Sequence, residues 1–170
     1  MGVSELNITL RKPNAKDGHA IHRLVDSCQP LDPNSMYCNL LQSCHFADTA
    51  VAAEGADELL GFVSGYRIPQ RPQTLFVWQV AVSADARGQG LASQMLQAIL
   101  TRAENQDIHA IETTITPDNK ASWALFERLA RKLDCQIDAE VMFDKQQHFN
   151  GEHETEMLVK LGPFDSSKLN

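Results

Sequence analysis

The hydrophobic residues of the chain recur at two spacings, which predict strands and helices in turn. Leu6–Leu10 alternates apolar and polar positions, as a half-buried strand does. After Asn14, a residue type that caps helices, the apolar positions from Ile21 to Cys28 follow the helical spacing and predict a helix. The same two patterns predict strands over residues 48–54, 59–66, 76–82, 108–115, 136–143 and 154–161, and helices over residues 36–44, 91–105 and from 120 onward.

This order of elements predicts the fold class. The series β-α-α-β-β-β-α-β-α-β-β mixes hairpins with crossovers, so we expect an α/β fold with a mixed (α+β) sheet of about seven strands and flanking helices. A dinucleotide-binding fold would instead alternate strand and helix throughout. Residues 1–163 are expected to form a single domain, followed by a disordered tail at residues 164–170.

The stretch Phe76–Ala92 is the most informative part of the sequence. Phe76–Val82 is an almost continuous apolar run, as in a strand covered on both faces, and Arg87–Ala92 (RGQGLA) then leads directly into an amphipathic helix. Glycines let the backbone approach a ligand closely, and the free N–H groups at a helix start attract anions. The stretch therefore predicts an anion site, and the expected anion is a phosphate chain.

Spacing distinguishes the phosphate motifs that this stretch resembles. A P-loop would continue from Gly90 with Lys and Ser or Thr, but Leu-Ala-Ser follows. A dinucleotide fingerprint would place its glycine turn directly after the strand, whereas five residues separate Val82 from Gly88. The pattern Arg-x-x-Gly-x-Ala, at Arg87, Gly90 and Ala92, is left as the favoured motif. Two alternatives are a dinucleotide fingerprint, which Glu112 about twenty residues further on supports weakly, and a glycine-rich loop without a ligand.

Composition and charge narrow the function classes. Hydrophobic residues make up 43% of the chain and charged residues 22%, which is ordinary for a globular domain. A formal charge of −7 argues against a broad nucleic-acid-binding face and favours a cationic substrate, although surplus acid also serves solubility alone. Met1–Leu10 lacks the pattern of a signal peptide, and no apolar run has membrane-spanning length. We therefore expect a cytoplasmic protein with neither nucleic acid nor membrane as partner.

The four cysteines predict no metal site. Cys28, Cys38, Cys44 and Cys135 form no Cys-x-x-Cys pair, so we interpret them as small, reduced core residues. A zinc site built on Cys44 and His45 is the alternative, but the sequence lacks further ligands at the usual spacing.

Several runs of the sequence resemble one protein family. Arg87, Gly90 and Ala92, between a buried strand and a helix, resemble the pyrophosphate-binding signature of the GNAT superfamily of acyl-CoA-dependent N-acyltransferases. The predicted element order is similar to the GNAT fold up to Leu161. Four further runs closely resemble the diaminobutyrate acetyltransferases, which acetylate the γ-amine (N4) of L-2,4-diaminobutyrate in ectoine biosynthesis: Leu31–Tyr37, Gly61–Tyr66, Phe76–Val82 and Glu112–Asn119.

The resemblance implies acetyl-CoA as co-substrate and direct attack by the amine in a ternary complex. Residues carried over for acetyl-CoA are the pantetheine-pairing Val80, Ala81 and Val82, the pyrophosphate-binding Arg87, Gly88, Gln89, Gly90, Leu91 and Ala92, and Asn119 near the thiol. One position departs from the family: many relatives carry a tyrosine that protonates the thiolate where this chain has Phe126. A phenyl ring donates no proton, so Tyr37, a water or the amine proton must do this work, or the thiolate leaves unassisted.

Acetyl transfer also requires a base and an oxyanion donor. A lysine-like amine with a pKa near 10.4 must lose a proton, which costs about 4 kcal/mol at neutral pH. Glu156 is the favoured base, with His153 as its orienting group or as an alternative base. The alternative is that these residues are solvated charges of an edge strand. A backbone N–H of Val80 or a neighbour is the expected oxyanion donor.

Substrate recognition needs an acid for the α-ammonium and donors for the α-carboxylate. Asp32, in a proline-bracketed loop that ends at a helix cap of Asn34 or Ser35, suits the first task. Tyr37, Thr114 and Trp78 suit the second task or shape the pocket. The alternatives are that Asp32 is a turn residue, Tyr37 a half-buried aromatic residue and Trp78 a core residue.

Two other functions fit the same sequence. One is a GNAT enzyme for another small amine or an antibiotic, and the other is a non-catalytic acyl-CoA-binding module, which the missing tyrosine at Phe126 would explain. Because the resembled family often dimerises, we also expect a homodimer, with the proline-rich segment Ile68–Gln73 at its interface.

Overall fold

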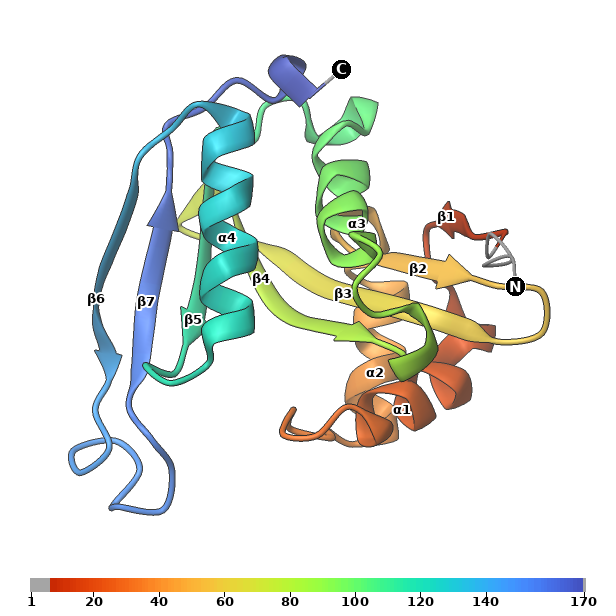
Figure 1. The fold of residues 1–170 in the computed structure, drawn as a ribbon, viewed down its shortest axis with the longest axis horizontal. Helices are drawn as coiled ribbons and strands as arrows, with labels where there is room; N and C mark the ends of the chain where they lie inside the picture. Colours follow the sequence, from red (N-terminus) through yellow and green to blue (C-terminus); the bar gives the residue numbers. More distant parts are fainter. Residues whose placement is uncertain (1–6, 170) are drawn as a thin grey trace. The chain divides into compact units, whose positions relative to one another are not determined.

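The computed structural model describes residues 7–169 and contains the strands and helices in the predicted order (Figure 1). The strands are β1 (Thr9–Arg11), β2 (Val51–Glu54), β3 (Leu59–Ile68), β4 (Arg71–Val82), β5 (Ala110–Ile115), β6 (Ile137–Phe143) and β7 (Glu156–Leu161). The helices are α1 (Gly18–Ser27), α2 (Met36–Cys44), α3 (Leu91–Leu100) and α4 (Lys120–Leu133). Short 3₁₀ turns lie at Ala15–Asp17, Ala47–Thr49, Ala84–Ala86, Ala103–Asn105 and Ser166–Leu169.

The strands form a seven-stranded mixed sheet in the order β1-β2-β3-β4-β5-β7-β6, which confirms the predicted fold class. Strands β4 and β5 run parallel, whereas β1–β2, β2–β3, β5–β7 and β6–β7 are antiparallel. The chain divides into two compact units: one takes the chain up to Tyr66 together with Gln79–Asn105, the other Arg67–Trp78 together with the chain from Gln106 onward. The single domain expected for residues 1–163 stays a prediction.

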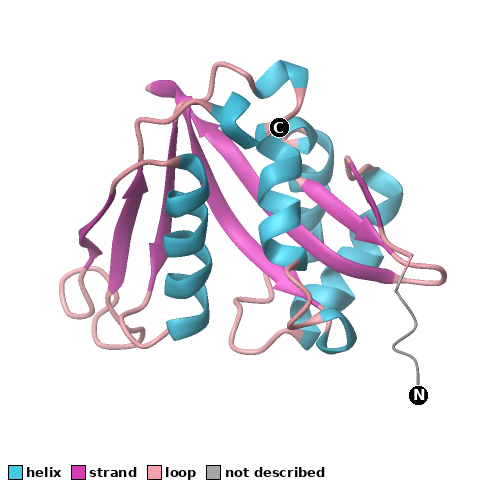
Figure 2. Ribbon diagram, turned by 45° about the horizontal axis from the view of Figure 1, so that its top comes forward, coloured by secondary structure: helices cyan, strands magenta, loops and turns pink. Residues whose placement is uncertain are grey.

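In the first unit, helices cover both faces of β2 and β3 (Figures 1 and 2). Phe62 of β3 packs into a core with Ile21 and Val25 of α1. The preceding Gly61 faces the opposite way, because successive residues of a strand alternate. A Cβ atom at Gly61 would lie 2.8 Å from Cε of Met95, so glycine here lets α3 approach the sheet closely.

In the second unit, α4 lies across β5 and β7 (Figure 1). Its inward stripe, which includes Leu125, Leu129 and Leu133, is buried, and so are Ile111 of β5 and Val159 of β7. The helical spacing of Ala121, Leu125, Phe126, Leu129 and Leu133 predicts such a stripe, which is confirmed except at Ala121, which is exposed. The other face of β5 and β7 is the side that carries Thr114 and Glu156.

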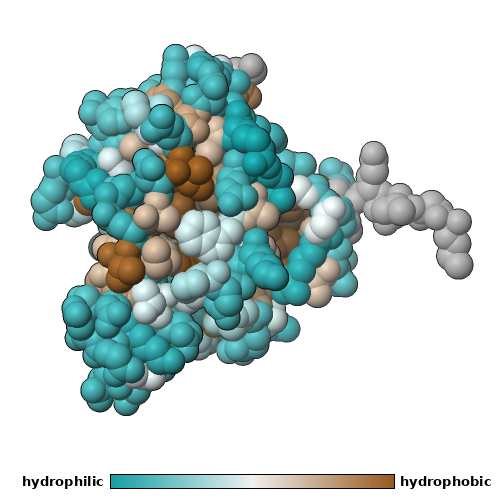
Figure 3. Space-filling model, turned by 60° about the vertical axis from the view of Figure 1, so that its left-hand side comes forward, coloured by the Kyte–Doolittle hydropathy of each residue, from teal (hydrophilic) through white to brown (hydrophobic). Residues whose placement is uncertain are grey.

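Strand β6 lies at one edge of the sheet and is exposed along most of its length. Asp138 and Glu140 place charges on it, which discourages edge-to-edge association. Its last residues are nevertheless apolar, and Val141 is 56% exposed. Figure 3 views the molecule from this side, where hydrophobic side chains form small areas in a mainly hydrophilic surface.

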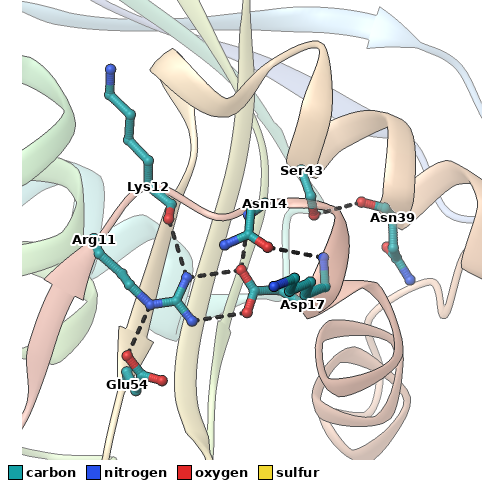
Figure 4. A network of polar contacts seen from close by, with 8 residues as sticks. Arg11, Lys12, Asn14, Asp17, Asn39, Ser43 and Glu54 are labelled. Atoms are coloured by element: carbon teal, nitrogen blue, oxygen red, sulfur yellow. Dashed lines mark hydrogen bonds and ion pairs between the residues drawn. The ribbon is translucent and has the colours of Figure 1, made fainter.

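A polar network organises the start of α1 (Figure 4). As predicted, Asn14 is a cap: its side chain accepts a hydrogen bond from the backbone of Lys16 in the 3₁₀ turn before α1. Asp17 accepts from the backbone N–H of Asn14 and from both terminal nitrogens of Arg11, each at 2.8 Å. Arg11 also donates to Glu54 of β2. The hydrogen bonds from Arg11 lower the pKa of the Asp17 carboxyl.

Helix α2 has the predicted bounds and Ser35 as its cap, but the predicted buried face was wrong. The helical spacing of Met36, Leu40, Leu41 and Cys44 predicts that these residues face the core. In the structure, Met36 and Cys44 are exposed and the two leucines are only half-buried. The fully buried side chains are Asn39, Gln42 and Ser43. Two of them have polar partners: Asn39 contacts His22 of α1 at 3.2 Å, and Ser43 donates to the Asn39 carbonyl. The side-chain amide of Gln42 and the amide oxygen of Asn39, in contrast, have no hydrogen-bond partner among the described residues.

The expectation of a disordered tail was also wrong. Phe164 is buried, and its backbone N–H donates to the carbonyl of His109 at 2.8 Å. Ser166–Leu169 forms a 3₁₀ turn beyond it. The buried phenyl ring anchors this segment. Asn170, like Leu6 of the predicted first strand, lies outside the described residues.

Two smaller expectations also changed. All four cysteines are free thiols, but Cys44 is exposed at the end of α2, so it is no core residue. The predicted loop Ile68–Gln73 is a tight connection in which only Pro69 and Gln70 separate β3 from β4. Within residues 7–169, no cluster of three or more His, Cys, Asp or Glu side chains is suited to hold a metal ion. Every helix in that range is too short or too polar to cross a lipid bilayer.

Candidate functional site

The predicted site residues divide between the two units, so each group is described by itself. Asp32, Tyr37, Val80–Val82 and Arg87–Ala92 belong to the first unit. Trp78, Thr114, Asn119, His153 and Glu156 belong to the second.

The glycine loop leads into an uncapped helix start. Gly90 is the N-cap of α3 and, within the described chain, no side chain caps this helix, whereas Ser35 caps α2 and Asn119 caps α4. Both Gly88 and Gly90 have φ of +75°, and a Cβ at either would meet no described atom within 4 Å. The N–H groups of the first turn of α3 are therefore available to an anion in an open loop, as the sequence predicted.

Hydrogen bonds to neighbouring backbone shape this loop. Nε of Arg87 donates to the carbonyl of Val82 at 3.1 Å, which folds the side chain back onto the end of β4. Gln89 donates to the carbonyl of Asp85 at 3.3 Å. Arg87, Gln89 and both glycines are exposed, whereas Leu91 turns into the core. The side chain of Leu91 thus anchors the helix start, and only its backbone N–H suits a phosphate.

The Asp32 loop is tied to β4 through a buried glutamine. Gln79, 7% exposed, donates from Nε2 to the carbonyl of Asp32 at 2.6 Å, and its Oε1 accepts from Asn34 Nδ2 at 2.9 Å. The backbone N–H of Gln79 donates to the hydroxyl of Ser64 on β3 at 3.2 Å. This N–H is therefore engaged and is no free oxyanion donor, and the assignment of that role to Val80 stays a prediction.

Two predicted residues occupy helix starts. Tyr37, in the first turn of α2, is 70% exposed, so it is no half-buried aromatic residue. Asn119 caps α4 by accepting a hydrogen bond from the backbone of Ser122 at 3.2 Å. This bond uses one of the two lone pairs of the amide oxygen. The roles of both residues toward substrate and cofactor stay predictions.

In the second unit, strand register places three predicted residues on one face of the sheet. Phe76 of β4 pairs with Glu112 of β5, and Trp78 and Thr114 each lie two residues further along. Thr114 pairs with Leu158 of β7, two residues beyond Glu156. Since side chains two apart share a face, Trp78, Thr114 and Glu156 all project away from α4. Trp78 is 42% exposed, so the alternative of a core residue is excluded.

Glu156 is a partly buried carboxylate whose surroundings change its pKa. Its side chain is 20% exposed, at the first residue of β7. Burial raises the pKa of Glu156, while His153 and a hydrogen bond from the Thr114 side chain lower it. The net effect is a raised pKa. A carboxylate of this kind is a stronger base than an exposed one.

His153 lies before the strand and turns toward Glu156. Its Nδ1 is 2.6 Å from the carbonyl of Glu154. Because a carbonyl oxygen only accepts, Nδ1 carries the hydrogen and Nε2 is the second site for a proton. Nε2 lies 3.8 Å from Oε1 of Glu156. This separation suits an electrostatic contact with Glu156 but is too long for a direct hydrogen bond.

The loop between β6 and β7 supports this histidine. The rings of His153 and Phe149 lie 4.6 Å apart, and Phe149 in turn contacts Phe143 of β6. Glu154, in contrast, is exposed and paired with Lys145. The description as a solvated charge thus fits Glu154 but not Glu156.

Phe126 is almost fully buried in the inward stripe of α4. The ring that replaces the tyrosine of many relatives is therefore a packing residue of the second unit. Because a phenyl ring has no hydroxyl group, Phe126 cannot donate a proton.

Two residues that support the predicted site, Gln79 and Phe149, were not predicted from the sequence. The position of Gln79 inside the apolar run Phe76–Val82 could have indicated its role, because a buried polar residue must find hydrogen-bond partners. No sequence feature indicates Phe149, because its contact with His153 depends on the path of an irregular loop.

Comparisons with known proteins show the family to which the chain is similar. The model of the Acetyltransferase (GNAT) family matches residues 19–130. The L-2,4-diaminobutyric acid acetyltransferase of Methylotuvimicrobium alcaliphilum is 72% identical over 92% of this chain and 91% of its own length; that of Vibrio cholerae is 50% identical over 92% and 90%. The solved structure of diaminobutyrate acetyltransferase EctA from Paenibacillus lautus, in complex with its substrate L-2,4-diaminobutyric acid and coenzyme A, superposes with a TM-score of 0.90 at 37% identity, covering 94% of this chain and 97% of that one.

Proposed function

The chain belongs to the GNAT family of acetyltransferases, and we propose that it transfers the acetyl group of acetyl-CoA to the γ-amine of L-2,4-diaminobutyrate, a step of ectoine biosynthesis. The observation that carries the substrate assignment is the 72% identity to a diaminobutyrate acetyltransferase over 92% of the chain. The carboxylate and histidine at the start of β7 supply chemistry that this reaction needs.

Acetyl-CoA is the co-substrate in this proposal. The open loop Arg87–Ala92 and the uncapped start of α3 bind its pyrophosphate through backbone N–H groups. Backbone groups of Val80, Ala81 and Val82 pair with the pantetheine arm, and the Asn119 amide contacts its thiol end. The glycine conformation at Gly88 and Gly90, with open space beside each, supports the pyrophosphate assignment.

Glu156 is the general base. It takes a proton from the γ-ammonium, directly or through a water, so that the neutral amine attacks the thioester carbonyl. The α-ammonium of the substrate lowers the cost of this step by charge repulsion. His153, half exposed and with Nε2 toward Glu156, passes the proton on to solvent. With Phe126 buried in α4, the leaving thiolate takes its proton from the amine by way of water or from Tyr37.

Asp32 binds the α-ammonium, and this contact distinguishes diaminobutyrate from amines that lack it. Trp78, Thr114 and Tyr37 are assigned to the substrate as residues that orient its carboxylate or contact its chain. The assembly as a homodimer and the location in the cytoplasm stay predictions.

An amine panel tests the proposal. Purified protein with acetyl-CoA should release CoA thiol rapidly with diaminobutyrate and far more slowly with ornithine, lysine or a polyamine, and NMR of the product should show the acetyl group on N4. Equal or faster turnover of a polyamine would refute the substrate while leaving the reaction class intact. Binding of acetyl-CoA in calorimetry without thiol release for any amine would instead indicate a non-catalytic acyl-CoA-binding module.

A further inference from the structure

Gln79 holds the Asp32 loop from inside strand β4. Its side-chain amide makes two hydrogen bonds, to the carbonyl of Asp32 at 2.6 Å and from the side chain of Asn34 at 2.9 Å. The orientation of the amide follows from chemistry: the Asp32 carbonyl only accepts, so the nitrogen of Gln79 must face it and the oxygen faces Asn34. One buried group therefore clamps the loop at two points.

The conformation of the Asp32 loop favours these two hydrogen bonds. Asn34 has φ of +52°, a left-handed conformation that asparagine tolerates better than most residues. Its backbone N–H donates to Oδ1 of Asp32 at 3.3 Å, so the carboxylate is fixed from within the loop as well. Asn34 thus orients the Asp32 carboxylate with its backbone and bonds Gln79 with its side chain.

Burial makes these bonds matter. Gln79 is 7% exposed, and an amide that loses its partners in such a place is strongly unfavourable. The residue also lies directly between Trp78 and Val80, and its backbone is tied to Ser64. A shift of the Asp32 loop would leave buried polar atoms without partners, so the loop keeps one position relative to β4.

We propose that Gln79 is a positioning residue that holds Asp32 beside strand β4 and thereby sets the selectivity for a substrate with an α-ammonium group. This inference rests on the proposed function, in which Asp32 binds that ammonium. In this proposal Gln79 acts through Asp32 and does not contact the γ-amine or the thioester that react.

The first test replaces Gln79 by methionine, which keeps the length of the side chain and removes both hydrogen bonds. The readout is the ratio of kcat/KM for diaminobutyrate to that for 4-aminobutyrate, which has the same γ-amine and carboxylate but no α-ammonium. We expect Gln79→Met to lower this ratio about tenfold, mainly through a higher KM for diaminobutyrate, with acetyl-CoA affinity in calorimetry unchanged. Asp32→Asn should lower the same ratio.

Matched controls separate positioning from a general loss of packing. Gln97→Met removes two hydrogen bonds that the side chain of a half-buried glutamine makes to Ser93, within α3, and should leave the ratio unchanged. Asn34→Gly keeps the left-handed backbone available and removes one bond to Gln79. Its effect should not add to that of Gln79→Met, because both changes break the same clamp.

A second test does not depend on activity. Hydrogen–deuterium exchange of the segment 31–35 should be faster in Gln79→Met than in the parent, and unchanged in Gln97→Met. An unchanged substrate ratio, or unaltered exchange in this segment, would overturn the proposal. A parent enzyme that fails to acetylate diaminobutyrate would instead refute the proposed function, and the exchange experiment would still decide whether Gln79 holds the loop.

Discussion

At the scale of single residues, Glu156 combines a position at the rim of a strand with a partly buried carboxylate. Thr114 bonds it from the neighbouring strand, and His153 lies at 3.8 Å. Glu154, two residues away, has neither feature and pairs with Lys145 in solvent. Two carboxylates of one short segment thus have different environments, and the difference makes them a matched pair for experiments.

Replacement of Glu156 by glutamine should remove the base while keeping the shape of the side chain. We expect kcat to fall about 100-fold or more, with acetyl-CoA affinity unchanged. Glu154→Gln is the control and should retain the parental rate. Steady-state kinetics across pH checks the assignment: kcat of the parent should fall as acid protonates Glu156, and an identical pH profile in Glu156→Gln would remove this residue from the role.

The same substitution should stabilise the protein at neutral pH. Burial raises the pKa of Glu156 above its ordinary 4.5, so the folded state favours the protonated form and loses stability as pH rises through the raised pKa. Glutamine has no such charge to desolvate. The Tm of Glu156→Gln should exceed that of the parent at pH 7, and the difference should vanish as pH falls below about 4.5. A lower Tm for the variant at pH 7 would contradict the burial of an ionised carboxylate.

At the scale of elements, the helix starts use three different devices. Ser35 and Asn119 cap α2 and α4 with side chains, a network around Asp17 precedes α1, and α3 begins at Gly90 without a side-chain cap. The first two devices serve stability. The third leaves N–H groups available to a ligand, which supports the proposed role of Arg87–Ala92 as the cofactor loop.

Asp17→Asn should destabilise the start of α1. The change removes the charge that Arg11 pairs through two hydrogen bonds, which predicts a loss of about 2 kcal/mol at pH 7. The pKa of Asp17 is lowered by Arg11, so its contribution is present above the ordinary value of 3.8 and is lost as pH falls through the lower folded-state pKa. Urea unfolding at pH 7 and at pH 3.5 should therefore show a gap between parent and variant that narrows in acid. A gap independent of pH would mean that the charge is irrelevant.

Gly90→Ala should weaken cofactor binding through the backbone. Alanine at φ of +75° is strained by about 1 to 2 kcal/mol, and relief of the strain would turn the first N–H groups of α3 away from the pyrophosphate. Calorimetry should show at least about tenfold weaker acetyl-CoA binding. Gly151→Ala, at φ of +80° in the β6–β7 loop, carries comparable strain and should leave the affinity unchanged. Equal losses in both variants would indicate general destabilisation instead.

At the scale of the whole molecule, the predicted homodimer would need apolar surface for a second chain to cover. The edge strand β6 ends in exposed apolar residues that offer such surface, whereas its charges at Asp138 and Glu140 disfavour backbone pairing along the strand. Light scattering of the purified protein should give the mass of two chains. A mass of one chain across the concentration range of the enzyme assay would refute the dimer.

The sequence alone was sufficient for the order of elements, the bounds of α2, the caps at Asn14 and Asn119, and the anion loop before α3. All of these depend on residues within a few positions of one another. Caps, turn glycines and periodicity act over one helical turn or one hairpin, so they can be recognised without knowledge of distant contacts. The family resemblance extended this to acetyl-CoA and the amine substrate.

Other features were decided only by the tertiary structure. Which face of α2 is buried depended on the polar partners that α1 offers to Asn39, and the order of the tail depended on a site for Phe164 beside His109. The clamp between Gln79 and Asp32 joins residues 47 positions apart. Polar side chains are ambiguous in a sequence because water satisfies them as well as a buried partner does. Only the folded structure determines whether a polar side chain is bonded to water or to a buried partner. It therefore also determines whether a residue such as Gln79 lies on the surface or supports the proposed site.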